Sequence, residues 1–348
     1  MKILIIQQKM IGDVLTSSIL FEALRLKYPN AQLDYLINEH TYAVVENNPH
    51  ISNYIFFTKA EEQSKLALLN LAKDIRSRKY DVVIDVYSKL SSNLITLISS
   101  AKVKISYFKP YTTLIYHHNI KRLQKTNDIA GLAIINRMQL LQPLQLDVNP
   151  LKPKIYLTTD ETAKAKSFLE HNGIDLSKPL YMISVLGSSE NKTYPLHFMS
   201  KVVDMISRET NGQILFNYNP NQALNAKQVY DLCKETTKKN IFFDVFGESL
   251  RDFLSIAHHC TAVIGNEGGA INMAKALEVK TFAIFSPWIE KATWNIFEGK
   301  NNTSVHLKDY YQELYNKPEK TFKKEYNQLY LTFEPSLFSK QLKSFLNR

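Results

Sequence analysis

The sequence predicts an α/β protein of two tandem doubly wound, Rossmann-like domains, and three observations support this fold class. The chain has 348 residues, about twice the usual size of one domain. In each half, short apolar runs alternate with amphipathic helical patterns, which is typical of a parallel sheet covered by helices on both faces. The alternation restarts after Pro143–Pro153, a segment with three of the chain's 12 prolines that we interpret as a linker.

The first half, residues 1–150, begins with the buried-strand run Lys2–Gln8, which stops shortly before Gly12-Asp13. A helical pattern follows this run and ends near Pro29. The other elements that we expect in this half are strands at Leu33–Ile37, Asp81–Tyr87 and Val103–Tyr107 and helices at Ala60–Arg78, Ser91–Ser99 and Asp128–Leu141.

The second half, residues 151–348, repeats the alternation. The strands that we expect are Tyr181–Leu186, Ile214–Tyr218, Ile241–Val245, Ala262–Gly265 and Thr281–Phe285, and the helices are Glu161–His171, Leu196–Glu209, Ala223–Thr237, Leu250–His259, Ala270–Leu277 and Ser336–Leu346. Ligands of doubly wound domains bind beyond the carboxyl ends of the strands, so we expect a site in a cleft between the two domains.

The composition argues against several classes of protein. The two cysteines, Cys233 and Cys260, are too few for a disulfide framework and do not form a CxxC zinc motif. The apolar run at the amino terminus is too short for a signal peptide, and no run of 18 apolar residues occurs, so we expect a cytoplasmic protein. No strand is followed by GxGxxG, and the chain has no P-loop and no HExxH, which argues against dinucleotide-dependent oxidoreductases, P-loop NTPases and zinc peptidases.

The charge distribution indicates an anionic partner. The formal net charge is +10, and no Asp or Glu occurs between Val86 and Asn127. The bases of this acid-free segment are Lys89, Lys102, Lys104, Lys109, Lys121, Arg122 and Lys125, and aromatic residues are interleaved with them. Nucleic acid, a membrane surface and a phosphorylated glycolipid would all suit such a segment, and a solvated basic face is the simpler alternative.

Gly12-Asp13 is the first of three candidate functional motifs. It lies at the carboxyl end of the first strand, where glycine lets a substrate approach the backbone closely. From this position Asp13 could accept a proton from an acceptor hydroxyl. The alternative is that Asp13 only caps the helix that follows.

Two Gly-containing turns in the second half are the other motifs. Gly187–Lys192 (GSSENK) lies between a strand and a helix, where free N–H groups, hydroxyls and a Lys can hold phosphate. Because the chain has no Asp-x-Asp, a diphosphate would be bound in this way rather than through a metal ion. Gly265–Asn272 (GNEGGAIN) offers Glu267 and Asn272 to sugar hydroxyls. The alternatives are an ordinary polar loop and close strand–helix packing.

These motifs, in this order, resemble glycosyltransferase family 9, the ADP-heptose:lipopolysaccharide heptosyltransferases, and the resemblance covers nearly the whole chain. Met1–Ile37 looks like the family's opening, with its Gly-Asp after the first strand. Gly187–Val203 is similar to the family's phosphate loop, with its Lys and a following aromatic-Pro pair, and Phe246–Phe285 is similar to its carboxyl-terminal signature.

The resemblance implies a GT-B fold, in which residues 1–150 bind the acceptor and residues 151–348 bind the nucleotide-sugar, with the last helix expected to pack back on the first domain. It implies Asp13 as the catalytic base. The donor-binding residues that it implies are Ser188, Ser189, Lys192, Gln222, Glu267, Gly268, Gly269 and Asn272. On the acceptor side we expect Gly12, Lys104, Lys109 and Lys121. No metal and no other cofactor is expected.

Three positions depart from the family pattern. The family has Asp at Glu267, His at Asn272 and a ribose-binding Glu near Gln222, so these departures bear on the donor sugar and the nucleotide rather than on the reaction. We therefore expect an inverting transfer of a heptose or related sugar to lipopolysaccharide core or a related glycolipid at the inner membrane face. A hexosyltransferase of another pathway and a non-catalytic nucleotide-sugar-binding module stay open. A nucleic-acid binder has only the basic charge in its favour.

Overall fold

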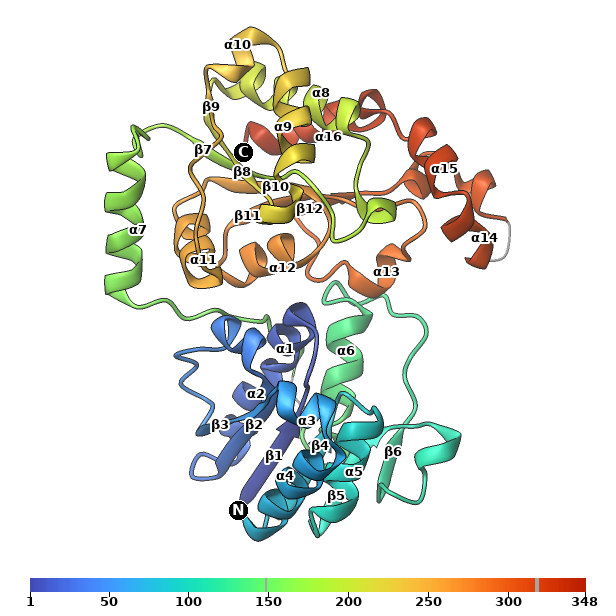
Figure 1. Ribbon diagram of the computed structural model, residues 1–348. Coiled ribbons are helices and arrows are strands. Elements are labelled where there is room, and N and C mark those ends of the chain that lie inside the picture. Colours follow the sequence, from blue (N-terminus) through green and yellow to red (C-terminus); the bar gives the residue numbers. More distant parts are fainter. Residues whose placement is uncertain (148, 317–318) are drawn as a thin grey trace. The chain divides into compact units, whose positions relative to one another are not determined.

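A computed structural model describes residues 1–147, 149–316 and 319–348; Val148, in the expected linker, lies outside the described residues. The chain forms two compact units (Figure 1). The first consists of Met1–Tyr156 and Ala292–Ile296, and the second of Leu157–Lys291 and Phe297–Arg348. The change of unit after Tyr156 lies shortly beyond residue 150, and the return of Ala292–Ile296 to the first unit was not expected from the sequence.

The first unit contains a parallel sheet in the order β3-β2-β1-β4-β5-β6. Its strands are β1 (Lys2–Ile6), β2 (Gln32–Asn38), β3 (Asn53–Phe57), β4 (Val82–Asp85), β5 (Val103–Tyr107) and β6 (His118–Ile120). The strand order reverses between β1 and β4, and such reversal points are where doubly wound sheets bind ligands. The edge strands β3 and β6 were not expected from the sequence.

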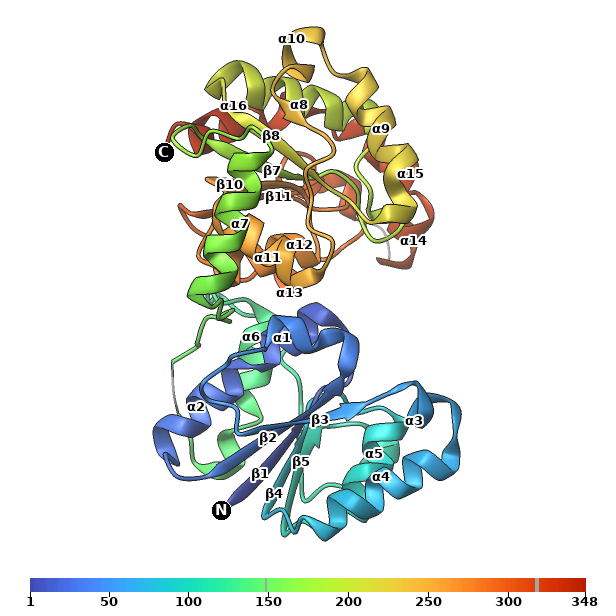
Figure 2. The ribbon, with the colours of Figure 1, turned by 60° about the vertical axis from the view of Figure 1, so that its left-hand side comes forward.

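Helices cover both faces of this sheet, which explains why β1 is a continuous apolar run rather than an alternating one. Helices α1 (Ile11–Ser17), α2 (Ile19–Lys27) and α6 (Leu132–Gln139) lie on one face, and α3 (Lys59–Gln63), α4 (Lys65–Ser77) and α5 (Leu90–Ile98) on the other (Figure 2). Ser18 and Ser64 interrupt the helices expected as single elements. The Ser64 hydroxyl accepts a hydrogen bond from the Ala67 N–H and so begins α4.

The second unit contains a parallel sheet in the order β12-β11-β10-β7-β8-β9, with its reversal point between β10 and β7. Its strands are β7 (Leu180–Ser184), β8 (Gln213–Asn217), β9 (Ile241–Phe242), β10 (Ala262–Asn266), β11 (Lys280–Ile284) and β12 (Asn302–Val305), the last of which was not expected. Gly265 has φ +130°, and a Cβ there would lie 2.4 Å from the Ser184 carbonyl oxygen. Glycine is therefore required where β10 meets β7.

The helices of the second half include the last helix of the chain, which packs inside the second unit. They are α7 (Thr159–His171), α8 (Leu196–Thr210), α9 (Ala223–Leu232), α10 (Glu235–Lys238), α11 (Leu250–His258), α12 (Gly269–Ala276), α13 (Lys291–Trp294), α14 (Glu319–Lys324), α15 (Tyr326–Thr332) and α16 (Pro335–Leu346). Helix α16 lies against α8 and buries Phe338, Leu342 and Phe345 in the second core. These apolar side chains complete the core of the second unit, and the expected packing of this helix on the first domain stays a prediction.

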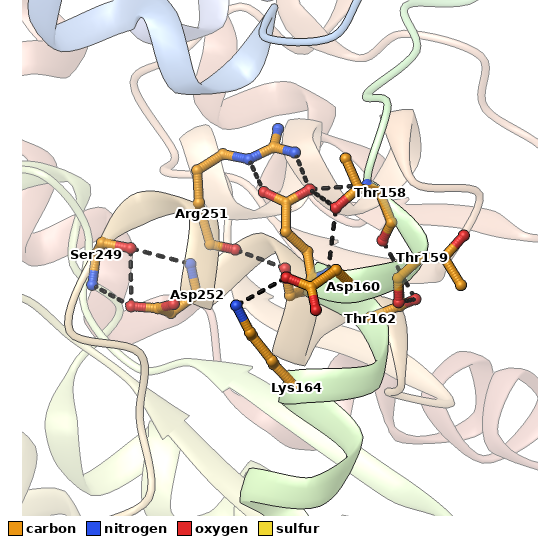
Figure 3. A network of polar contacts seen from close by, with 10 residues as sticks. Thr158, Thr159, Asp160, Thr162, Lys164, Ser249, Arg251 and Asp252 are labelled. Atoms are coloured by element: carbon orange, nitrogen blue, oxygen red, sulfur yellow. Dashed lines mark hydrogen bonds and ion pairs between the residues drawn. The ribbon is translucent and has the colours of Figure 1, made fainter.

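Helix α7, the first helix of the second unit, packs on α11 and is joined to it by a bidentate ion pair (Figure 3). The Arg251 guanidinium donates to both carboxylate oxygens of Glu161, at 2.7 and 2.6 Å. The same carboxylate accepts from the Thr158 N–H and hydroxyl and thereby caps α7. The hydrogen bonds from Arg251 are the main reason why the pKa of Glu161 falls to about 2.

This lowered pKa predicts how the stability of the second unit depends on pH. A carboxylate with a depressed pKa stabilises the folded state above its unfolded pKa of 4.5, and the contribution is lost as the pH falls toward 2. We expect Glu161→Gln to cost about 2 kcal/mol near pH 7 and to flatten the fall in unfolding free energy between about pH 4.5 and 2.5. Urea titrations at several pH values measure this, with Glu170→Gln, an exposed carboxylate 3.9 Å from Lys166, as the control. Parallel pH profiles for wild type and Glu161→Gln would contradict the prediction.

Candidate active site

The predicted site residues form two groups, one at the carboxyl edge of each sheet. In the first unit, Asp13 lies in the first turn of α1, directly after β1. The Arg137 guanidinium, from α6, donates to Asp13 Oδ1 at 2.7 Å, and it also donates to the Ser17 hydroxyl at 2.9 Å and the Ala133 carbonyl at 2.8 Å. The Arg137 side chain is 8% exposed and that of Asp13 is 27% exposed. A buried, three-way anchored Arg therefore fixes one carboxylate oxygen while the carboxylate stays accessible.

Asp13 also accepts the Met10 N–H at 3.5 Å, so it takes part in capping α1 as the alternative interpretation expected. This contact is long, and it uses Oδ2, whereas the Arg137 contact uses Oδ1. Capping alone would not require a buried guanidinium against the other oxygen. The contact with Arg137 therefore orients the Asp13 carboxylate independently of its role as a helix cap.

A second polar group of the first unit lies at the carboxyl end of β4. The Asp85 carboxylate is buried, accepts the Ser88 N–H at 2.7 Å, and lies 2.6 Å from the Tyr116 hydroxyl. Burial raises the pKa of Asp85 to about 6. The Lys109 ammonium donates to the Ser88 carbonyl oxygen and lies near Asp85.

The structure separates the predicted acceptor-side bases from one another. Gly12 lies in α1 beside Asp13, and Lys109 joins the Asp85 group. Lys121 follows β6 at the sheet edge, 5.7 Å from the Phe108 ring centre. Lys104 pairs with Val83 near the amino end of β5, and its ammonium donates to the Leu97 carbonyl. Since strands of a parallel sheet share one carboxyl edge, this placement removes Lys104 from the surroundings of Asp13.

The predicted phosphate loop of the second unit connects β7 to α8. A Cβ on Gly187 would lie 2.2 Å from the Lys192 carbonyl oxygen, so only glycine allows the loop to fold back on itself. The Thr193 hydroxyl accepts the Gly187 N–H at 3.0 Å and the Gln222 amide donates to the Gly187 carbonyl at 2.9 Å. These contacts leave Ser188 and Ser189 exposed at the tip of the loop.

The same loop is fixed to the segment after β11. The Asn191 carbonyl oxygen accepts hydrogen bonds from the Ser286 hydroxyl at 2.7 Å and from the Trp288 indole N–H at 2.6 Å. The Lys192 ammonium lies 5.9 Å from the Trp288 ring centre. This contact orients the Lys192 side chain but does not neutralise its positive charge, because the indole ring carries no formal charge.

The turn after β10 lies beside this loop. The buried Asn266 side chain accepts the Tyr194 N–H at 2.7 Å and donates to the Ser184 and Val185 carbonyls. Glu267 follows it, and burial raises its pKa, an effect opposed by the nearby charge of Lys192. Gly268 lies just before α12, Gly269 is its first residue, and Asn272 lies in its first turn. The structure thus brings Lys192 and Glu267 together.

A pocket of about 620 Å³ adjoins the phosphate loop within the second unit. Its lining includes Ser189, Gln222, Asn225 and Tyr330. The Gln222 amide nitrogen donates to the Gly187 carbonyl of the loop, and its oxygen accepts the N–H of Asn219, in the turn that contains Gln222. A pocket with both apolar and polar walls beside a Lys-bearing loop can hold a small ligand with a polar part.

Two doubly wound units, one with an oriented carboxylate and one with a phosphate-type loop, suit an enzyme that acts on a nucleotide-linked substrate. The model of glycosyltransferase family 9 (heptosyltransferase) matches residues 68–323, more than half of the chain. The chain belongs to glycosyltransferase family 9 and is a glycosyltransferase.

Individual relatives are distant. Lipooligosaccharide heptosyltransferase 2 of Haemophilus influenzae is 22% identical over 298 residues, which cover 82% of this chain and 84% of that protein. Lipopolysaccharide heptosyltransferase 3 of Escherichia coli is 23% identical over 172 residues, so this match spans about half of each chain, 47% and 48%.

Solved structures confirm the fold class. The family 9 glycosyl transferase of Veillonella parvula has a TM-score of 0.84 at 18% identity, with 99% of this chain and 97% of that chain covered. The E. coli heptosyltransferase WaaC, solved with ADP-2-deoxy-2-fluoro heptose, has a TM-score of 0.64 at 15% identity, with 88% and 93% covered. At these identities the likeness establishes two tandem doubly wound units, the GT-B fold.

The residues beside the predicted motifs that sequence reasoning missed include Arg137, Asn266 and Trp288. Arg137 lies 124 positions after Asp13 and Trp288 lies 97 positions after Asn191, so no local pattern joins either pair. Asn266 could have been recognised from the sequence as a site residue, because it is a polar residue that ends the apolar run Ala262–Gly265 just before the Gly-rich turn.

Proposed function

We propose that this glycosyltransferase transfers a heptose or a related sugar, with inversion, from an ADP-linked donor to the lipopolysaccharide core or a related envelope glycolipid. The observation that carries the proposal is the pair of preformed groups, Asp13 held by Arg137 in the first unit and Lys192 held at Trp288 in the second. The heptosyltransferase relatives, and the ADP-2-deoxy-2-fluoro heptose with which WaaC was solved, support heptose and ADP.

In the first unit, the acceptor hydroxyl would lose its proton to the free oxygen of Asp13 as it attacks the anomeric carbon of the donor. Arg137 holds Oδ1, which leaves Oδ2, weakly engaged at 3.5 Å, as the proton-accepting atom. A single attack of this kind breaks the bond to the diphosphate and inverts the anomeric centre. General-base catalysis of this type contributes roughly 10²–10⁴-fold to the rate.

In the second unit, the diphosphate would gain negative charge as it leaves. Lys192, the exposed hydroxyls of Ser188 and Ser189, and backbone N–H groups near Gly268 and Gly269 are the groups that we propose to stabilise it. The negative charge on the diphosphate grows as its bond to the sugar breaks, and hydrogen bonds strengthen with the charge on the acceptor, so these groups favour the transition state over the bound donor. We propose that no metal ion is required.

A positioning role for Arg137 can be tested with Arg137→Met and Arg137→Lys. Loss of the guanidinium frees the Asp13 carboxylate to rotate, so we expect kcat to fall roughly 10- to 100-fold in Arg137→Met with an unchanged KM for the donor. Arg137→Lys should recover part of the activity because it restores a charge contact. The pH profile of kcat, measured beside the melting temperature, separates the roles. A loss of stability with an unaltered kcat and pH profile would make Arg137 purely structural.

Donor binding is the direct test of the proposed function. We expect calorimetry to give the highest affinity for ADP-heptose among ADP-heptose, ADP-hexose, UDP-hexose and GDP-hexose. Glu267 and Asn272, which depart from the family pattern, favour a hexose donor as the second candidate, and tighter binding of a UDP- or GDP-hexose would establish it instead. Donor binding without transfer to any glycolipid acceptor would make the protein a binding module.

We also propose that the first unit contacts an anionic membrane face through the acid-free segment. No helix among the described residues is both long and apolar enough to cross a bilayer. Tyr111 is 74% exposed, Leu114 is fully exposed, and Lys121 and Lys125 are exposed in the same segment. Exposed apolar side chains among bases suit peripheral contact with anionic lipid.

Charge reversal tests the membrane contact. Each Lys near an anionic surface contributes about 1 kcal/mol, so Lys121→Glu with Lys125→Glu should weaken binding to phosphatidylglycerol-containing liposomes at least about tenfold. The matched control reverses Lys234 and Lys239, two exposed lysines of the second unit, which changes the net charge equally. Cosedimentation measures the binding. An equal loss in both double variants would show an effect of net charge alone.

A further inference from the structure

Two buried polar groups near the amino terminus of α5 lack hydrogen-bond partners among the described residues. They are the side-chain nitrogen Nε2 of Gln8, two residues after β1, and the hydroxyl of Ser88, just before α5. Gln8 is 1% exposed and Ser88 is fully buried. Burying an unpaired polar group destabilises a protein, so such groups at a ligand-binding edge of a sheet indicate a partner that is absent from the chain itself.

The hydrogen bonds made by the other polar atoms of Gln8 and Ser88 place both residues at the amino terminus of α5. Gln8 Oε1 accepts the Ser91 hydroxyl at 2.6 Å, and Ser91 lies in the first turn of α5. This contact fixes the Gln8 amide against the helix terminus. Ser88 has φ +50° and donates its N–H to Asp85, and its carbonyl oxygen accepts from the Lys109 ammonium. The region lies between the carboxyl ends of β1 and β4, where the strand order reverses.

Hydrogen-bond donors predominate in this region. Gln8 Nε2 can only donate, the Ser88 hydroxyl can donate, and the Lys109 ammonium can only donate. The first N–H groups of an α-helix have no intrahelical acceptor, and the terminus carries a partial positive charge. The neighbouring Asp85 carboxylate already accepts from the Ser88 N–H and lies against the Tyr116 hydroxyl. A ligand group with several acceptor oxygens and negative charge fits these donors.

We propose that Gln8, Ser88, Lys109 and the amino terminus of α5 form a subsite for an anionic substituent, a carboxylate or a phosphate, of the acceptor saccharide. The inference rests on the proposed function only in assigning the anion to the acceptor. The anion draws the Lys109 ammonium away from the Ser88 carbonyl, because a hydrogen bond between opposite charges is stronger than one to a neutral carbonyl. This exchange opens the way to Ser88 and Gln8.

The experiment observes the Gln8 side-chain amide directly by ¹⁵N-correlated NMR of the full chain, with its resonance assigned by its loss in Gln8→Met. The probes are glucuronate, glucose 6-phosphate and glucose, added without donor. We expect a saturable shift of the Gln8 resonance with one or both anionic sugars and none with glucose. A response to glucuronate alone identifies a carboxylate, and a response to glucose 6-phosphate alone identifies a phosphate.

Variants separate ligand binding from structural effects. Ser88→Ala removes an unpaired buried hydroxyl, so it should leave the melting temperature unchanged or raised while it weakens anion binding at least about tenfold. Gln8→Glu keeps an acceptor for Ser91 but replaces the donor with a negative charge, and it should abolish binding. Gln139→Met is the control, because it removes another unpaired buried side-chain atom, Gln139 Oε1, on α6 rather than on α5. We expect no change in anion binding from it.

Two outcomes would overturn the subsite: no saturable shift of the Gln8 resonance with either anionic sugar, or an equal shift with glucose. Binding that survives both Ser88→Ala and Gln8→Glu would place the anion elsewhere and overturn it as well. Since no donor is present, this result is independent of the donor calorimetry. A failed donor screen with an intact anion response would refute the proposed donor and leave the subsite standing.

Discussion

Asp13→Asn should lower the turnover of glycosyl transfer by roughly 10²- to 10⁴-fold, the usual contribution of a general base. The amide keeps an oxygen that can accept from Arg137, so the side chain should stay in place, but it can no longer take up a proton. The donor is proposed to bind in the second unit, and its dissociation constant should change little. Single-turnover transfer and donor calorimetry on the same preparation measure the two quantities.

The matched control is Asp74→Asn, which removes an exposed carboxylate of the same unit that pairs with Arg78 at the surface. It should have no effect on turnover, because exposed pairs of this kind contribute little. Full activity of Asp13→Asn would show that Asp13 serves only to cap α1. A drop in melting temperature large enough to unfold the protein at the assay temperature would be visible in the calorimetry as lost donor binding.

Lys192→Met should weaken donor binding by about 1.5–3 kcal/mol, roughly 10- to 100-fold, since it removes a charged hydrogen-bond donor to the diphosphate. It should lower kcat as well, because charge grows on the leaving diphosphate during transfer. Methionine keeps much of the length of the side chain against Trp288, so the loop should retain its shape. Calorimetry with the donor and steady-state kinetics measure the two effects.

Lys201→Met is the control for this variant. Lys201 is exposed on α8, 5.2 Å from the Phe198 ring centre, so its replacement makes the same change in charge within the same unit. Donor affinity should be unaffected. An equal loss of affinity in both variants would mean that only the overall charge of the second unit matters, and it would remove Lys192 from the donor site.

Much of the fold could be predicted from the sequence because the central strands are buried on both faces. The runs Lys2–Gln8 and Tyr181–Leu186 coincide with the observed β1 and β7 to within a residue or two at each end, since continuous apolar segments of this length indicate interior strands. The strands that were missed, β3, β6 and β12, lie at sheet edges. An edge strand such as β6, with the sequence His118–Ile120, is short and partly exposed, so the pattern that identifies interior strands is absent.

The loops that carry the site residues could be predicted from the sequence, but the side-chain contacts that hold these loops in place could not. Gly12-Asp13 and Gly187–Lys192 stood out because glycine and polar residues interrupt the pattern at strand ends. What fixes those loops comes from elsewhere in the chain, as with Arg137 for Asp13. Lys104 shows the limit of the charge pattern. Its strand, expected at Val103–Tyr107 and observed as β5, places it near the amino end, away from the edge that carries Asp13, so its acceptor role stays a prediction.

The return of Ala292–Ile296 to the first unit means that the polypeptide passes from one unit to the other three times. In the first unit, a Cβ on Gly131 would lie 2.6 Å from the Asn295 carbonyl oxygen, so this short segment fits closely against the turn before α6, the helix that carries Arg137. A single proteolytic cut at the boundary near Tyr156 therefore cannot release either half intact. The amino-terminal fragment would lack the peptide that closes over Gly131, and Arg137 would lose part of the support that keeps it facing Asp13.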